Sequence, residues 1–112
     1  MDSSNALATF DALKREILKL GFTRPGSLVR RFMPCGKFSC RCTSGPTHWH
    51  GPYYQWSYKV GGKTRTMRLT KEQAGLCEEW TRNHKRLRML VRQIERISLK
   101  ETNRSLAAIC RL

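Results

Sequence analysis

Residues 35–69 decide the fold of this chain, and they read CGKFSCRCTSGPTHWHGPYYQWSYKVGGKTRTMRL. Three cysteines and two histidines lie within the first sixteen residues, from Cys35 to His50. The second half contains two strand-like runs separated by Gly61-Gly62, a pair that is favoured in two-residue hairpin turns. The stretch therefore predicts a metal-clamped loop that leads directly into a β-hairpin.

The two expected hairpin strands, residues 53–60 and 63–69, alternate between two kinds of side chain. A two-residue turn pairs Val60 with Lys63 and, further along, Trp56 with Met67. One face then gathers side chains typical of a core, namely Tyr54, Trp56, Tyr58, Met67 and Leu69. The opposite face is polar or cationic apart from one tyrosine ring, and it consists of Tyr53, Gln55, Ser57, Lys59, Thr64, Thr66 and Arg68.

We expect one α+β domain, in which a helix precedes a three-stranded antiparallel sheet and a long helix follows it. Apolar residues recur at steps of three and four up to Leu20, and Gly21 stands where a glycine ends many helices. A capping box from Thr70 to Gln73 opens the second helix. The expected parts of this single domain (1–112) are a helix over 1–21, a zinc-clamped loop with the sheet over 22–70, a heptad-patterned helix over 71–98 and a tail over 99–112 that contains a break in the pattern at 101–103.

The long helix carries a seam at alternating steps of three and four, which is typical of helix-to-helix packing. The part beyond Leu87 outruns a small sheet, so it has to pack on the first helix, on a second copy of itself or on another protein. The seam begins at Cys77, a core position, and a homodimer is one state that it allows. The candidate interface residues are Trp80, His84, Leu87, Val91 and Ile94.

The cysteines and histidines of the loop offer a Cys3His ligand set, which zinc binds in tetrahedral geometry at structural sites. Five cysteines in the chain, an odd number, fit a disulfide framework poorly. Between the two histidines we favour His50 over His48, because His50 stands next to the first strand of the hairpin and would tie the loop to the sheet. We therefore expect one structural zinc ion on Cys35, Cys40, Cys42 and His50.

Nothing in the sequence indicates catalysis. A catalytic zinc normally keeps an open position beside a general acid or base, yet residues 22–70 contain no Asp or Glu. Glycine-rich phosphate loops and paired carboxylates are missing from the sequence as well. We expect a protein that is not an enzyme.

The charge balance is the strongest feature of the composition. The chain has 22 Lys and Arg against 8 Asp and Glu, a net charge of +14. Nine of the basic residues lie in the acid-free block 22–70, which contains the loop and the hairpin. A field of this kind attracts polyanions, and nucleic acid is the first candidate.

We expect the polar sheet face to bind nucleic acid, with duplex DNA favoured over RNA, because antiparallel strands can enter the major groove. Lys and Arg supply affinity for phosphates, whereas Gln, Ser and Thr can reach base edges. An exposed Tyr53 keeps RNA and single strands as alternatives. The candidate contact residues are Arg30, Arg31, Lys37, Arg41, Gln55, Ser57, Lys59, Lys63, Thr64, Arg65, Thr66 and Arg68.

Two other interpretations remain open. The polar face can be an ordinary solvated surface, as most polar sheet faces are. The protein can also be an interaction or assembly module that dimerises through its heptad helix and uses its charge on an acidic or nucleoprotein partner. Because no apolar run approaches the roughly 20 residues of a membrane span and no signal pattern is present, we expect a cytoplasmic protein without a membrane partner.

Residues 25–73 contain the blocks PGSLVRR, CGK, CRC, HGPYY and GGKTRT, and this pattern resembles a family of short, uncharacterised prokaryotic proteins. The resemblance implies that the three loop cysteines and His50 are the motif positions of that family, and it carries a link with mobile elements. Separately, the order of sheet and helix is similar to that of the arm-binding domains of tyrosine integrases, an analogy of fold alone.

Overall fold

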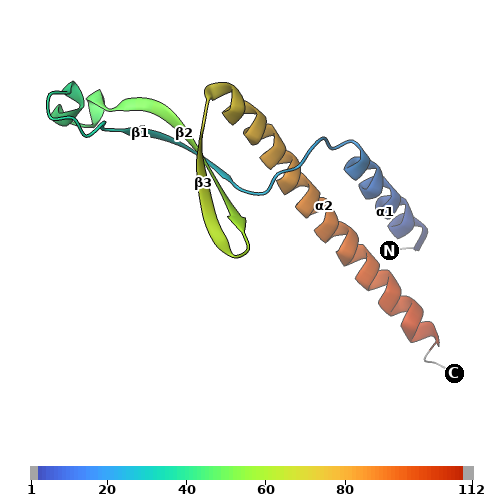
Figure 1. Ribbon diagram of the computed structural model, residues 1–112. Helices are drawn as coiled ribbons and strands as arrows, with labels where there is room; N and C mark the ends of the chain where they lie inside the picture. Colours follow the sequence, from blue (N-terminus) through green and yellow to red (C-terminus); the bar gives the residue numbers. More distant parts are fainter. Residues whose placement is uncertain (1–2, 110–112) are drawn as a thin grey trace. The chain divides into compact units, whose positions relative to one another are not determined.

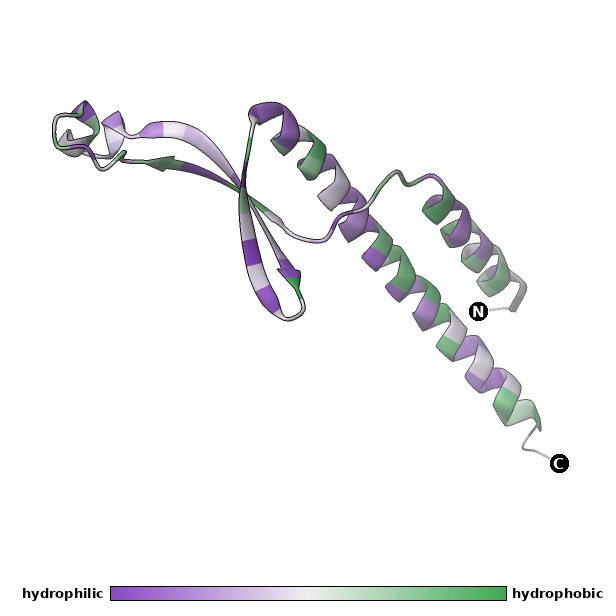
Figure 2. Cartoon of the chain, viewed as in Figure 1, coloured by the Kyte–Doolittle hydropathy of each residue, from purple (hydrophilic) through white to green (hydrophobic). Residues whose placement is uncertain are grey.

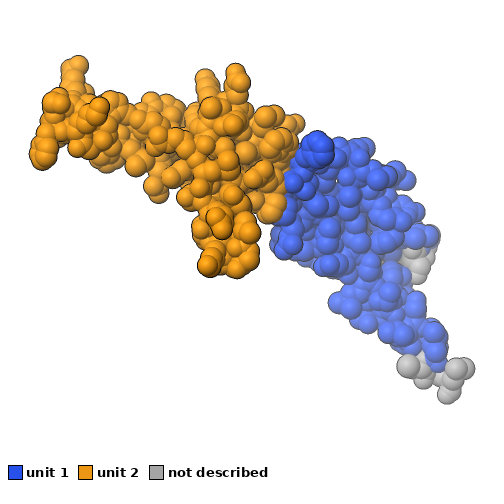
Figure 3. All heavy atoms as spheres, in the orientation of Figure 1, with its two compact units in different colours: residues 1–23, 82–112 blue, residues 24–81 orange. Residues whose placement is uncertain are grey.

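The computed structural model describes residues 3–109 of the chain, and it confirms the predicted α+β class and order of elements (Figure 1). The elements are α1 (Ser3–Leu18), β1 (Ser27–Met33), two short 3-10 helices (Arg41–Ser44 and Pro46–His48), β2 (His50–Val60), β3 (Lys63–Leu69) and α2 (Lys71–Ile109). The chain divides into two compact units (Figure 3). Unit 1 consists of the described parts of residues 1–23 and 82–112, and unit 2 consists of residues 24–81.

Unit 2 is built around an antiparallel sheet in the order β1-β2-β3. The predicted hairpin register is confirmed, with Val60 opposite Lys63 and Trp56 opposite Met67. Strand β2 begins three residues earlier than the expected residue 53, because its first residues pair with the end of β1, up to His50 opposite Met33. The alternation along β3 is visible as strongly hydrophilic bands between paler and hydrophobic ones (Figure 2).

The core of unit 2 lies between one sheet face and the first turns of α2. The buried residues are Trp56, Leu69, Ala74 and Cys77, and the partly buried residues packed against them are Leu28, Tyr54, Tyr58 and Trp80. The predicted core face is therefore confirmed, although Met67 at its margin remains 42% exposed. The chain passes Trp56 so closely at Gly26 that a Cβ atom there would lie 2.4 Å from the indole ring. Only glycine fits this position.

Helix α2 begins at the predicted capping box. The N–H of Thr70 donates to Oε1 of Gln73 at 2.9 Å, and the N–H of Gln73 donates to Oγ1 of Thr70 at 3.2 Å. These reciprocal bonds satisfy two donors at a helix start that have no partner within the helix.

The expected end of the long helix at residue 98 and the break at 101–103 are wrong, because α2 continues to Ile109. The hydroxyl groups in this region bond back to carbonyls of the helix instead of interrupting it. Thr102 Oγ1 donates to the carbonyl oxygen of Ser98 at 2.7 Å, and Ser105 Oγ donates to that of Glu101 at 3.1 Å. Residues 99–109 of the expected tail thus belong to α2, and residues 110–112 lie outside the described residues.

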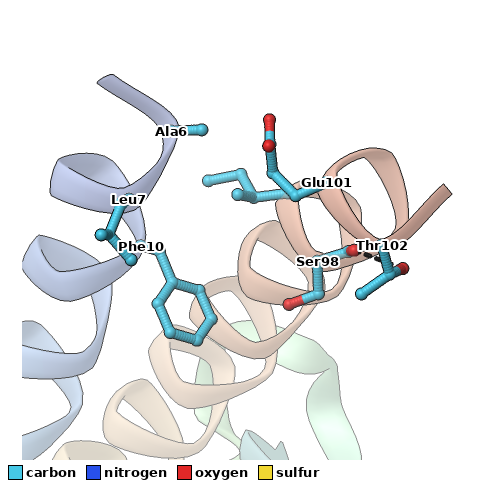
Figure 4. Close-up of a pocket in the computed structure, with 7 residues that line it drawn as sticks. Ala6, Leu7, Phe10, Ser98, Glu101 and Thr102 are labelled. Carbon is cyan, nitrogen blue, oxygen red and sulfur yellow. Dashed lines mark hydrogen bonds between the residues drawn. The ribbon is translucent and has the colours of Figure 1, made fainter. Parts of the chain in front are cut away.

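In unit 1, α1 and the second part of α2 run antiparallel. Near the end of α1, Glu16 pairs with Arg86 at 3.8 Å, and Asn83 Nδ2 donates to the carbonyl oxygen of Phe22 at 2.9 Å. At the other end of the pair, an open pocket is lined by Ala6, Leu7 and Phe10 from α1 and by Ile97, Ser98, Glu101 and Thr102 from α2 (Figure 4). Helix α1 ends at Leu18, before the expected residue 21, as the N–H groups of the next two residues bond to carbonyls three residues back.

The seam of α2 is only partly as predicted. Leu90 is almost fully buried, whereas its neighbour Val91, an expected seam residue, is 37% exposed. Leu87, Leu90, Ile94 and Ile97 are buried or half-buried and lie at steps of three and four along α2. The covered side of α2 in unit 1 therefore passes through Leu90, and Val91 lies about 100° away from Leu90 around the helix axis. No helix within residues 3–109 has the length and apolar character that crossing a bilayer requires.

Candidate metal centre and the surfaces around it

Four side chains from the loop and the adjoining strand form a Cys3His cluster. Cys35 follows β1, Cys40 and Cys42 lie at the first 3-10 helix, and His50 opens β2. The ligand atoms of all four lie within 4.8 Å of one another, close enough to hold a metal ion. Among the described residues, His48 is not a member of this cluster.

The spacing of the sulfur and nitrogen atoms suits tetrahedral coordination. Sγ of Cys35 lies 3.5 Å from Sγ of Cys42, and Sγ of Cys40 lies 3.1 Å from Nε2 of His50. A zinc ion with Zn–S bonds of about 2.3 Å requires sulfur atoms roughly 3.8 Å apart, so the two ligand-to-ligand distances need only small adjustments. The sulfur atoms are much further apart than the roughly 2.05 Å of a disulfide. The described cysteines are free.

The surroundings of the cluster favour thiolates. A hydrogen bond from the backbone of Cys42, aided by the His50 side chain, lowers the pKa of Cys40 to about 6. The pKa of Cys35 is also lowered, first by the backbone of Lys37. The bond with Cys40 raises the pKa of His50. A metal ion would displace the proton that this thiolate and imidazole otherwise share.

Cys42 differs from the other two thiols. The N–H of Cys35 donates to Sγ of Cys42 at 3.3 Å, and this hydrogen bond by itself lowers the pKa of Cys42. Exclusion from water and the neighbouring thiols have the larger combined effect, so the pKa of Cys42 is raised. Cys42 is also the only buried residue between Pro34 and Trp49. The loop thus encloses its own cluster and little else, and turn hydrogen bonds such as Cys40 N–H to the carbonyl oxygen of Lys37 at 3.1 Å shape it locally.

The join between the loop and the sheet depends on Gly51. Its φ of +146° is rarely adopted by other residues, and a Cβ atom there would lie 2.8 Å from the carbonyl oxygen of Arg31. Strand β2 therefore approaches the end of β1 at a distance that only glycine allows. This close approach brings His50 to the cysteines.

The strand register divides the predicted nucleic-acid contacts between two faces and the loop. Residues that share the polar face with Gln55 are Arg31, Gln55, Ser57, Lys59, Thr64, Thr66 and Arg68. Arg30, Lys63 and Arg65 stand opposite Tyr54, Val60 and Tyr58, and so belong to the face that carries Trp56. Lys37 and Arg41 lie on the loop. The structure thus brings seven of the twelve predicted residues together on one surface.

Within the polar face, two cross-strand pairs stand at the centre. Gln55 lies opposite Arg68, and Ser57 lies opposite Thr66. The Arg68 guanidinium group also lies over the Tyr53 ring, 4.5 Å from its centre. This cation-π contact orients the charged group along the face.

The predicted interface residues of α2 have different surroundings. Trp80 packs on the core of unit 2. In unit 1, His84, Leu87 and Ile94 are half-buried, and Val91 is exposed. The sequence reasoning did not single out Phe38, whose side chain is wholly exposed on the loop. The available signal was an aromatic residue outside any periodic stretch, next to Lys37 in an acid-free segment.

The fold and the cluster define a small α+β protein with a candidate Cys3His metal centre. Residues 10–83 match the family described as a domain of unknown function, DUF6788, and the chain belongs to this family. The match covers about two thirds of the chain and includes the whole loop and sheet. Comparison with curated proteins and with solved structures gave no match.

Proposed function

We propose that this protein binds nucleic acid, with duplex DNA as the favoured form, through the polar face of its sheet. The observation that carries the proposal is the coincidence of the acid-free block, nine cations in residues 22–70, with a sheet whose register gathers hydrogen-bonding side chains on one face. A solvated surface normally mixes both signs of charge. A one-signed surface supports a polyanionic partner.

The polar face has the two kinds of side chain that such a partner needs. Lys59, Arg68 and Arg31 can neutralise phosphates, which gives affinity without sequence selectivity. Gln55, with the hydroxyl groups beside it, can donate to and accept from base edges in the major groove.

We further propose that the cluster holds one zinc ion in a structural role. Three thiolates and an imidazole are the donor set that zinc accepts at closed, four-coordinate sites. With four protein ligands no position is left open for a substrate. The acid-free block also provides no carboxylate to act as general base. The same observations support a protein that is not an enzyme.

The test of the binding face uses two variants that remove the same charge from opposite faces. One replaces Arg31, Lys59 and Arg68 by Ala, and the other replaces Arg30, Lys63 and Arg65 by Ala. Fluorescence anisotropy with a labelled 20-base-pair duplex is measured over a range of salt concentrations. Each lost phosphate contact should reduce the slope of log K against log salt by about 0.9, so the polar-face variant should lose up to about 3 and the control much less.

Equal losses in the two variants would show that net charge, not the polar face, determines binding. No salt-dependent binding by the wild-type protein would overturn the proposed function. Zinc content by atomic emission, with one ion expected per chain, tests the metal separately.

The second candidate function is assembly through α2, and one observation favours it. Leu99, Leu106 and Ile109 are each more than 60% exposed, at the heptad-like spacing of seven and three. Light scattering of the wild-type protein, with Leu99→Glu/Leu106→Glu as the disrupted form, tests this candidate. A dimer that the double variant converts to a monomer would support assembly, and a wild-type monomer would contradict it.

A further inference from the structure

The loop carries an aromatic side chain that no part of unit 2 covers. Phe38 is 100% exposed, and it lies between two residues of the metal cluster, Cys35 and Cys40. The hydrogen bond from Cys40 N–H to the carbonyl oxygen of Lys37 closes a tight turn directly beside it. The ring therefore projects from a short segment that is fixed at both ends when a metal is bound.

The other aromatic rings near this end of the sheet have partners. Arg68 lies over Tyr53, and Arg30 lies over Phe32 with 5.7 Å to the ring centre. Trp49 is 38% exposed, so more than half of it is covered. Phe38 thus has both ring faces free, and ordering it on a partner would cost little entropy because the segment that bears it is short and braced.

The charge around Phe38 indicates the class of partner. Lys37 directly precedes Phe38, and Arg41 directly follows the cluster residue Cys40. No Asp or Glu lies between residues 22 and 70. A flat apolar ring between two cations matches a nucleotide, which presents a stacking face between two phosphates. Proteins bind unpaired bases by stacking them on aromatic side chains while cations track the backbone. A paired base inside a continuous duplex offers no free face.

We propose that Phe38 stacks on an unpaired base and that Lys37 and Arg41 bind the phosphates on either side of it. This inference rests on the proposed nucleic-acid function and adds a second contact to the polar sheet face. The protein should then prefer a duplex that contains an unpaired base over a continuous duplex of the same length.

The experiment compares two DNA probes, a continuous duplex and the same duplex with one extra, unpaired 2-aminopurine. The full-length, zinc-loaded protein should quench the 2-aminopurine fluorescence and bind the bulged probe more tightly. Base-aromatic stacking is worth about 1–3 kcal/mol, so Phe38→Ala should weaken binding of the bulged probe by roughly 5- to 150-fold and leave the continuous duplex unchanged. Phe38→Trp should restore both the affinity and the quenching.

Phe32→Ala is the matched control, because it removes a partly exposed phenylalanine from the same end of the sheet. Its preference for the bulged probe should equal that of the wild-type protein. Zinc content of the Phe38→Ala variant should also be unchanged, which separates loss of stacking from loss of the loop.

Three outcomes separate this inference from the function on which it rests. Salt-dependent duplex binding without a preference for the bulge, or with a preference that Phe38→Ala retains, would overturn the stacking contact alone. Failure to bind either probe would overturn both proposals. Binding to phosphatidylserine vesicles that depends on Phe38, with no effect of Phe38→Ala on the bulged probe, would make the ring a membrane contact and overturn the proposal.

Discussion

The two halves of strand β2 are held in place in different ways. From Tyr54 to Ser57 the strand has a neighbour on each side and the first turns of α2 over one face, so Trp56 has no exposed surface. From His50 to Tyr53 it pairs with β1 alone, and none of its side chains is buried. Yet this half adjoins the long loop, in which the ligand atoms of the cluster lie close together.

The difference indicates where a bound metal ion would matter. Apolar burial is the main source of stability at the α2 end, where each large side chain contributes about 1.5–3 kcal/mol. A two-stranded ribbon without a core is marginal in water, and a long loop beyond it is more so. We infer that metal ligation at the cluster takes the place of the missing core.

The largest expected effect comes from removing two ligands. Structural zinc contributes an apparent free energy of about 10–16 kcal/mol near neutral pH, so Cys40→Ser/Cys42→Ser should lose the ion and the order of the distal half. Hydrogen exchange should show the amides of residues 31–33 and of His50, Gly51 and Tyr53 unprotected while that of Trp56 stays protected. Global unfolding would mean that the core cannot stand without the metal. Cys77→Ala, which removes a core thiol, should keep the zinc.

The core half is tested by Trp56→Ala. Truncating a fully buried aromatic side chain leaves a cavity, and the free energy of unfolding should fall by about 3–5 kcal/mol. Trp49→Ala, on the loop, removes the same atoms from a partly exposed site and should cost less than half as much. Chemical denaturation monitored by circular dichroism gives both values. Similar losses in the two variants would remove the distinction between the two halves.

A smaller effect is expected where the loop joins the sheet. Gly51→Ala and Gly45→Ala both place a side chain at a positive φ near +145°, which costs roughly 1–3 kcal/mol by itself. Only the Cβ at residue 51 also meets backbone, 2.8 Å from the carbonyl oxygen of Arg31, since nothing lies within 4 Å at residue 45. Gly51→Ala should therefore be the more destabilising and should weaken zinc binding as well. Equal unfolding free energies would show that β1 moves away without cost.

The smallest effect concerns the start of α2. Thr70→Ala removes one of the two capping-box bonds and should lower the free energy of unfolding by about 1 kcal/mol. Thr102→Ala provides the same substitution inside the helix, where alanine is the better helix former, and should be neutral or slightly stabilising. A thermal shift of the same size in both variants would mean that the cap contributes nothing.

Local patterns determined much of what the sequence predicts correctly. The Gly61-Gly62 turn fixed the hairpin register, because a period of two leaves no choice once the turn is known. The same register already places Lys63 and Arg65 opposite Val60 and Tyr58, so the division of the cations between two faces followed from the sequence as well. In the loop, the three closely spaced cysteines and the place of His50 beside the first hairpin strand sufficed to select the four cluster residues.

Features that depend on a distant partner were not predictable in this way. Which side of α2 is buried depends on where α1 lies, and the heptad pattern pointed to Val91 where the structure buries Leu90. The continuation of α2 past Glu101 depends on hydroxyl groups that bond back along the helix, a choice that the residue types leave open. The exposure of Phe38 was likewise not predictable, because it depends on whether another part of the fold covers the ring, and none does.

The hydrogen bond from the N–H of Arg24 to the carbonyl oxygen of Trp80, at 3.2 Å, has a consequence for the order of folding. It joins the first and the penultimate residues of unit 2. Unit 2 lies in the sequence between the two helical segments of unit 1, so folding of unit 2 brings the ends of that intervening segment together. Before unit 2 folds, pairing those helices means closing a long, disordered loop, and the entropy lost rises with its length. Once unit 2 has formed, that loss has already occurred. Unit 1 should therefore be the last part of the chain to assemble.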